Sequence, residues 1–534
     1  MIRPARGQVR PTAARPAAMK AKTFPAPRRG WVLSENYAIQ SPETALTLDN
    51  WFPTTTGIRV RGGRAKNATL AGAIPVRSMW EYIGASGRKR FAADLDKIYD
   101  ITTPSTPTTP ISATVTGRTS GYYSTLQMTT TGGIYQYCFN GTNSPLLYDG
   151  TSFTPITGVS TPAITGVTTS LLSHGWVYSN RIFMVQGGTQ TAWFLPVDSV
   201  GGAAQDISLA GVFQDGGALL FGATWSLDAG DGTNQKCVFV STTGEVAIYQ
   251  GTDPSDPTKW SIQGVYNISR PLGMKAIMQA GGDLLIATEE GVIALSEAVS
   301  KDSAALSLSA VSRAIEPEWR REAKDRISLP FEILKWSANS MMVVSLPPVT
   351  GLDNICFVCN IQTGAWARFT NWQTRCMSLF NGRGYFGAND GCIYEMEAGG
   401  SDDGTPYTAA YSGAFDHLDA PGVTKTITMA RTIFKAATPI IAKVSGSIDY
   451  AETLPSAPSS PANFLTSEWD SGLWDSALWD TSNIKASYKT GWVGIGETGF
   501  SFAPQVQLTY GVTPLPRVEL VAFDIAYEQG GLIV

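Results

Sequence analysis

The segment CVFVSTTGEVAIYQG, residues Cys237 to Gly251, has the pattern of two short strands joined by a tight turn. The run Cys237–Val240 is rich in β-branched and aromatic residues, and Glu245–Tyr249 is a second run of this kind. Between them, Gly244 can take the positive φ that a tight turn needs. The segment therefore predicts a β-hairpin. A lone hairpin buries too little apolar surface to be stable in water, so we expect it to pack against further strands.

The strand, turn and strand pattern recurs along the chain. Seven copies can be aligned, at Arg90–Thr102, Tyr135–Gly150, Arg181–Pro196, Cys237–Gly251, Asp283–Ser296, Ile355–Phe369 and Arg383–Glu397. Their equivalent positions, all predicted to be buried, are Phe91, Tyr137, Phe183, Phe239, Leu285, Phe357 and Tyr385. A repeat of roughly 40 to 50 residues with one sheet per repeat is typical of β-propeller blades. Two ordinary β-sandwiches with a coincidental spacing are the alternative.

Composition and length agree with an all-β chain of several parts. The 534 residues include 54 Gly and 31 Pro, and only 16% are charged, which is typical of a turn-rich β protein. We predict an irregular β-propeller of six or seven blades over residues 76–401. A C-terminal β-sandwich-like domain follows over residues 402–534, where longer alternating runs replace the repeat. A short surface helix is expected near 315–326, where EPEWRREAKDR has helical charge spacing.

The N-terminal residues differ from the rest in charge. Residues 1–34 hold eight Lys or Arg and no acidic residue, whereas the remainder holds 32 basic and 44 acidic residues. We interpret residues 1–23 as a basic, disordered arm, and residues 24–75 as an extended lead-in that could supply the missing outer strand of the last blade. The arm's candidate contact residues for nucleic acid or an acidic partner are Arg3, Arg6, Arg10, Arg15, Lys20 and Lys22. An acidic body argues against a general nucleic-acid-coating role.

The sequence predicts no catalytic residue, no cofactor and no metal site. The two histidines, His174 and His417, lie in no motif, and the six cysteines are expected to be reduced and buried in strands. Cys356 and Cys359 have CxxC spacing, but residues three apart on a strand face opposite sides. Residues 494–499 match GxGxxG, but no helix follows, so we interpret them as a turn. No apolar run is long enough for a membrane-spanning helix.

The segment EWDSGLWDSALWDTS, residues 468–482, carries a tryptophan at every fifth position. Large aromatic side chains on a turn-rich loop either pack against a neighbour or are displayed for stacking on a sugar or partner. We therefore name Trp469, Trp474 and Trp479 as a candidate contact with another subunit or partner.

Six segments together carry a resemblance to a known family. They are LDNWFPTTTGIRVRGG (Leu48–Gly63), GEVAIYQGTDPSDPTKWSIQGVYNISRPLG (Gly244–Gly273), GGDLLIATEEGVIALS (Gly281–Ser296), NIQTGAWARFTNW (Asn360–Trp372), YFGANDGCIYE (Tyr385–Glu395) and DDGTPY (Asp402–Tyr407). In combination these segments resemble the tail nozzle proteins of short-tailed bacteriophages, also called tail tubular protein B or packaged-DNA stabilisation protein. The likeness runs from about residue 24 to the C-terminus, and none of its motifs is catalytic.

The resemblance implies a structural virion protein that is assembled in the host cytoplasm. A ring of six copies would extend the DNA channel below the portal and the adaptor or head-completion protein, retain packaged DNA and anchor tail fibres or spikes. Double-stranded DNA would pass without sequence-specific binding, and no membrane insertion is expected. The alternative is a receptor- or glycan-binding β-propeller module of a phage tail. A third hypothesis is that the chain is a hydrolase with a propeller fold.

Overall fold

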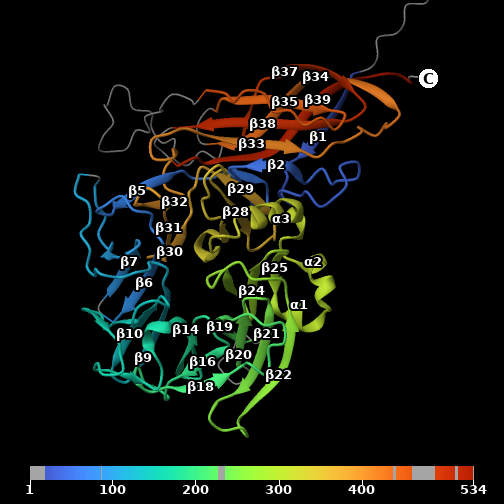
Figure 1. The fold of residues 1–534 in the computed structure, drawn as a ribbon. Coiled ribbons are helices and arrows are strands. Elements are labelled where there is room, and N and C mark those ends of the chain that lie inside the picture. Colours follow the sequence, from blue (N-terminus) through green and yellow to red (C-terminus); the bar gives the residue numbers. More distant parts are fainter. Residues whose placement is uncertain are drawn as a thin grey trace, which may run out of the picture.

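The chain is an all-β protein, as predicted, and strands make up most of its regular structure. The structure, a computed structural model, describes residues 19–85, 87–106, 108–226, 235–436, 440–459, 487–511 and 515–532. A series of small sheets forms the lower part of the molecule, and long C-terminal strands lie above it (Figure 1). None of the helices in these described ranges is long and apolar enough to span a membrane.

Seven antiparallel groups of three or four strands, here called blades 1 to 7, follow one another along the described chain; six are separate sheets, and blade 6 is one half of an eight-stranded sheet. Blade 1 contains β6 (Ser78–Gly84), β7 (Gly87–Ala93) and β8 (Ile98–Asp100), and blade 2 contains β9 (Ser124–Thr130), β10 (Gly133–Phe139), β11 (Leu146–Tyr148) and β12 (Phe153–Pro155). Blade 3 contains β14 (Leu172–Tyr178), β15 (Arg181–Gln186), β16 (Thr191–Phe194) and β18 (Gln205–Ser208). Blade 4 contains β19 (Leu219–Ser226), β20 (Gln235–Ser241), β21 (Glu245–Gly251) and β22 (Trp260–Asn267), and blade 5 contains β23 (Ile277–Ala280), β24 (Asp283–Thr288) and β25 (Gly291–Ala294). Blade 6 contains β26 (Glu332–Trp336), β27 (Met341–Ser345), β28 (Ile355–Asn360) and β29 (Trp366–Thr370), and blade 7 contains β30 (Cys376–Phe380), β31 (Arg383–Gly387), β32 (Cys392–Met396) and β5 (Arg64–Thr69).

The blades have the cyclic order of a β-propeller. The first strands of neighbouring blades contact one another in most pairs, and β30 of blade 7 contacts β6 of blade 1. Apolar clusters fill the spaces between successive blades, and one of them joins blade 7 to blade 1 through Tyr385, Ile393, Met79 and Ala92. The outermost strand of blade 7 is β5, which comes from the N-terminal segment and pairs antiparallel with β32.

The seven aligned positions are all buried, and all but Phe357 lie on the second strand of their blade. Five of them face the next blade, but Phe239 packs with the aromatic cluster of blade 3 and Phe357 packs toward blade 5. At Phe239 the alignment is shifted by one residue, which on a strand moves the side chain to the opposite face. At Phe357 it is shifted by one strand, because β28 is the third strand of blade 6.

Two larger sheets form the sandwich above the blades (Figure 1). One sheet has the order β3 (Trp51–Pro53), β4 (Ile58–Val60), β39 (Val518–Leu532), β34 (Val423–Ala436) and β36 (Ser487–Lys489), with β1 (Lys20–Pro25) on β39 and β37 (Val493–Gly499) on β34. The other continues blade 6 through β2 (Ala45–Asp49), β33 (Tyr407–Gly413), β38 (Phe502–Tyr510) and β35 (Ala442–Ile448). The N-terminal segment is therefore more than an extended lead-in, because β1 to β4 belong to the sandwich and β5 to blade 7.

One other expectation differs from the structure. The GxGxxG stretch is not a turn: it lies within β37, which pairs with β34. The helix predicted near 315–326 is α3 (Glu316–Asp325), inserted between blades 5 and 6, with Arg320, Arg321 and Lys324 exposed on its outer side. Its Trp319 is 1% exposed within the main core, because the apolar side of the helix packs against both blades. Two short helices on blade 5, α1 (Leu295–Ser300) and α2 (Leu306–Ser309), were not predicted.

Candidate functional site

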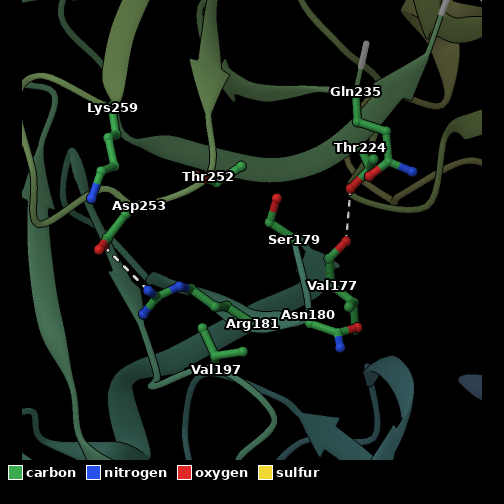
Figure 2. A pocket seen from close by; sticks show the side chains of 10 residues that line it. All are labelled: Val177, Ser179, Asn180, Arg181, Val197, Thr224, Gln235, Thr252, Asp253 and Lys259. Carbon is green, nitrogen blue, oxygen red and sulfur yellow. Dashed lines mark hydrogen bonds and ion pairs between the residues drawn. The ribbon is translucent and has the colours of Figure 1, made fainter. Parts of the chain in front are cut away.

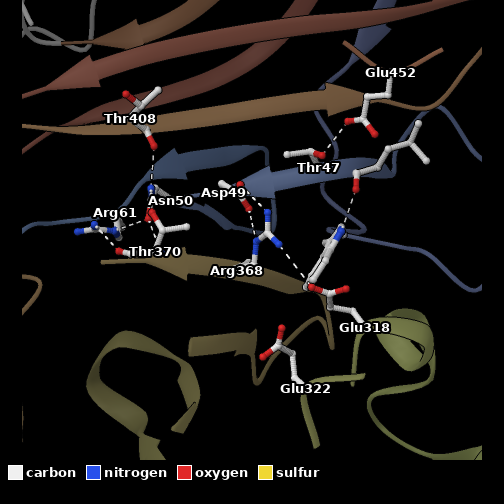
Figure 3. A network of polar contacts seen from close by, with 12 residues as sticks. Thr47, Asp49, Asn50, Arg61, Glu318, Glu322, Arg368, Thr370, Thr408 and Glu452 are labelled. Carbon is white, nitrogen blue, oxygen red and sulfur yellow. Dashed lines mark hydrogen bonds and ion pairs between the residues drawn. The ribbon is translucent and has the colours of Figure 1, made fainter. Parts of the chain in front are cut away.

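A buried polar network lies where the blades meet the sandwich (Figure 3). Its centre is Arg61, which is fully buried and forms a two-pronged ion pair with Asp402, with distances of 2.9 and 2.7 Å. The guanidinium group also lies 3.9 Å from the ring centroid of Tyr407. Burial alone would lower the pKa of Arg61, but Asp402 outweighs it and raises the pKa, so the guanidinium group keeps its charge. Asp402 is also buried, with 3% of its surface exposed.

Asn50 connects Arg61 to the two neighbouring sheet segments. Its side-chain oxygen, Oδ1, accepts hydrogen bonds from Arg61 Nε at 2.7 Å and from the backbone amide of Thr370 at 2.9 Å. Its side-chain nitrogen, Nδ2, donates to Thr370 Oγ1 and to the Thr408 carbonyl, both at 2.7 Å. One side chain thus joins β29 of blade 6 to β33 of the sandwich, next to the point where β2 bridges the two strands.

A second ion-pair group lies beside this centre. Arg368 on β29 binds both carboxylate oxygens of Asp49 on β2, at 2.7 and 2.8 Å, and lies 3.5 Å from Glu318 of α3. Burial raises the pKa of Glu318, and the nearby Arg321 and Arg368 oppose that effect. Helix, blade and sandwich are therefore held by one set of charges, as Figure 3 shows. A polar cavity of about 610 Å³ opens beside Asp49 and Arg368.

A second cavity, of about 680 Å³, lies between blades 3 and 4 (Figure 2). Its side chains are mostly polar and include Ser179, Asn180, Thr252 and Lys259. Arg181 and Asp253 form an ion pair of 3.2 Å across the cavity, from one blade to the other. The cavity can hold a polar ligand, but no aromatic residue lines it.

The predicted contact residues are placed only in part. Trp469, Trp474 and Trp479, and Arg3, Arg6, Arg10 and Arg15, lie outside the described residues. Lys20 and Lys22 belong to β1 and not to a disordered arm. Lys22 contacts Asp416 at 2.9 Å, and Lys20 donates to Gln529, so both side chains bind within the chain.

His174, which lies in no sequence motif, joins the inner strands of three consecutive blades. Its Nε2 lies 3.0 Å from the carbonyl of Gly222 on β19, and its Nδ1 lies 2.7 Å from Ser124 Oγ on β9. A carbonyl can only accept, so Nε2 carries the proton and Nδ1 accepts from the serine. Burial lowers the pKa of His174 to about 4, which keeps the ring neutral.

The cysteines have no partner sulfur. All six are described, buried and unpaired, and burial raises their pKa values, which disfavours the thiolate. Cys356 and Cys359 belong to different apolar clusters on opposite faces of β28, as the spacing predicted. Among the described residues, no group of three His, Cys, Asp or Glu side chains is arranged to hold a metal ion.

Comparison with known proteins gives little to add to this geometry. No family model and no curated protein matches the sequence. Among solved structures, the chain is similar to the crystal structure of the computationally designed Ika8 protein, with 9% sequence identity and a TM-score of 0.35. The match covers 62% of this chain and 99% of that one.

Proposed function

We propose that this protein is a structural virion protein, a tail nozzle subunit of a short-tailed bacteriophage. In this role a ring of copies extends the DNA channel below the portal and adaptor, retains packaged DNA and anchors fibres or spikes. The main support for this role is that three of the six segments that carry the resemblance meet in the buried network around Arg61. These segments are Leu48–Gly63, Asn360–Trp372 and Asp402–Tyr407.

The way in which blade 6 is joined to the sandwich, here called the junction, suits such a role. A channel component under load must not hinge between its parts, and a single eight-stranded sheet runs from blade 6 into the sandwich. The ion pairs of Arg61 and Arg368 reinforce that connection from both sides. Breaking a buried pair is strongly unfavourable because it leaves an uncompensated charge, so the junction resists opening.

The assembly state of the purified chain tests the proposal. Native mass spectrometry should find a closed assembly of the 57.1-kDa subunit, with six copies expected from the resemblance. Addition of the adaptor protein encoded beside the same gene should give a defined complex. A subunit that stays monomeric both at micromolar concentration and with that adaptor would contradict the nozzle role.

A receptor- or glycan-binding module of a phage tail is the second candidate. The polar cavity between blades 3 and 4 favours it, because hydroxyl, amide and charged groups converge there (Figure 2). Under this alternative the isolated chain binds host cells and blocks phage adsorption, and replacing Asn180 and Lys259 with alanine removes that effect. A chain that neither binds cells nor competes with phage would exclude it.

A further inference from the structure

Three side chains at one end of the propeller form a cationic cluster that the proposed function does not use. Arg375, Arg77 and Tyr122 lie one or two residues before the innermost strands β30, β6 and β9 of blades 7, 1 and 2. Arg77 lies 5.4 Å and Arg375 lies 5.9 Å from the centroid of the Tyr122 ring. The two guanidinium groups therefore share one aromatic ring.

In the part of the chain that the structure describes, neither arginine has a negative partner. Among the described residues, no carboxylate lies within ion-pair distance of Arg77 or Arg375, although most other described arginines form such pairs. The Nε atoms of both are buried and make no hydrogen bond. Arg375 donates only to neutral groups, at 2.9 Å to Asn389 Oδ1 and at 2.7 Å to the Tyr122 hydroxyl. Two like charges beside one ring, with donors left unused, are unfavourable unless an anion joins them.

Two acidic residues of blades 1 and 6, Asp94 and Glu332, are engaged elsewhere. Asp94 directs its carboxylate to the Tyr99 hydroxyl and to the amides of Asp96 and Lys97. Glu332, at the start of β26, pairs with Lys275 at 3.3 Å and accepts from the Met377 amide.

The cluster is held in place by its backbone. The amides of Arg77 and Arg375 donate to the carbonyls of Ala93 and Gly387, at 2.7 and 3.1 Å. The residue after Tyr122 donates its amide to Ser78 Oγ at 2.8 Å. Gly121 allows the Tyr122 segment to approach blade 1, because a Cβ there would lie 1.4 Å from the Asp94 carbonyl oxygen. A ligand would therefore meet preorganised donors.

We propose that Arg77, Arg375 and Tyr122 form a binding site for a phosphate group. A phosphate offers three terminal oxygens and up to two negative charges, which suits two guanidinium groups and a hydroxyl donor better than a carboxylate does. The Tyr122 hydroxyl accepts from Arg375, so its own proton is available to the ligand. Free phosphate and the phosphodiester backbone of DNA share this chemistry. The site does not depend on the ring assembly.

Titration of the purified full chain with inorganic phosphate, at constant ionic strength, tests the site. Isothermal calorimetry should show saturable binding, and Arg77→Gln should raise Kd by about tenfold or more, since one charge-assisted interaction is lost. Tyr122→Phe keeps the ring and should weaken binding less. Arg383→Gln is the matched control, because it removes an arginine that is 67% exposed and paired with Glu395 on the same blade. Unfolding temperatures measured in chloride alone show whether each variant folds.

Two further measurements identify the source of the phosphate group. If short duplex DNA binds and phosphate competes with it in an Arg77-dependent way, the ligand is a phosphodiester. If phosphate binds and DNA does not, the ligand is a free phosphate or a small phosphorylated compound. Equal Kd values for wild type, Arg77→Gln and Arg375→Gln would overturn the proposal, as would binding of citrate without binding of phosphate.

Discussion

His174 links three blades through a neutral ring, and this makes stability depend on pH. A histidine in an unfolded chain has a pKa near 6.5, whereas the folded-state pKa of His174 is about 4. Between these values the unfolded chain binds more protons than the folded one. The contribution of His174 to stability is therefore complete above pH 6.5 and is lost as the pH falls toward 4.

Replacing each histidine separately measures this contribution. In urea unfolding, the wild type should lose about 2 kcal/mol between pH 7 and pH 5 from this group. His174→Gln should remove that part of the loss, while its amide can still reach Gly222 and Ser124. His417→Gln serves as the control, because His417 contacts Tyr450 and Phe500 near the surface. If His174→Gln and wild type have the same slope, His174 titrates normally.

Among the junction residues, replacing Asp402 should reduce the free energy of unfolding most. Asp402→Asn leaves the fully buried Arg61 without a counter-charge, and we expect a loss of about 3–5 kcal/mol in the free energy of unfolding. The neighbouring Asp403→Asn should cost about 1 kcal/mol or less, since its pair with Lys66 is solvent-exposed. Urea unfolding of the two variants compares them directly. Similar losses for both would mean that the buried pair is not what holds the junction.

At the scale of elements, the hairpin repeat predicts much of the fold. Strand propensity and turn glycines locate the second strand of every blade except blade 6, where the predicted hairpin falls on the third and fourth strands. Phe239 and Phe357 are not equivalent to the other five positions, because alignment on large residues resolves neither a shift of one position nor a shift of one strand. Charge spacing predicted α3, but it does not identify the partner of the apolar side of that helix.

The candidate sites could not be predicted in this way. Arg61 and Asp402 are far apart in the sequence, and no local pattern pairs them. Arg77, Tyr122 and Arg375 are single residues in separate linkers, and only the cyclic order of the blades brings them to one place. Contacts of this kind depend on long-range topology, on which periodicity carries no information.

The turn of the index hairpin offers a test at this scale. Gly244 has a φ of +106°, and a Cβ there would lie 2.1 Å from the Ile268 carbonyl oxygen. Gly244→Ala should therefore destabilise the protein by on the order of 3 kcal/mol. Gly281→Ala is the matched control, because Gly281 has a φ of +65° with open space around its Cβ position, and it should cost about 1–2 kcal/mol. Thermal unfolding that ranks them in the opposite order would contradict this account.

For the whole molecule, the proposed ring requires two different lateral surfaces on each subunit, and the Trp-rich loop remains our candidate for one of them. Replacing Trp469, Trp474 and Trp479 with alanine should weaken ring formation or docking of a neighbouring tail protein, while the melting profile of the subunit stays unchanged. Trp492→Ala is the control, since Trp492 is 44% exposed and does not belong to the repeated segment of residues 468–482. Unchanged native masses and particle yield in the triple variant would remove the loop from the assembly.

The pairing of β5 with β32, and of β1 with β39, has a consequence for biosynthesis. Both strands are made before their partners, because β32 ends at Met396 and β39 at Leu532. At roughly 5–20 residues per second, the early strands wait on the order of tens of seconds without their ladders. The ring of blades cannot close before β32 is made, and the sandwich cannot close before β39 is made. A truncated product therefore cannot reach the finished shape, and incomplete chains are kept out of any assembly that recognises it.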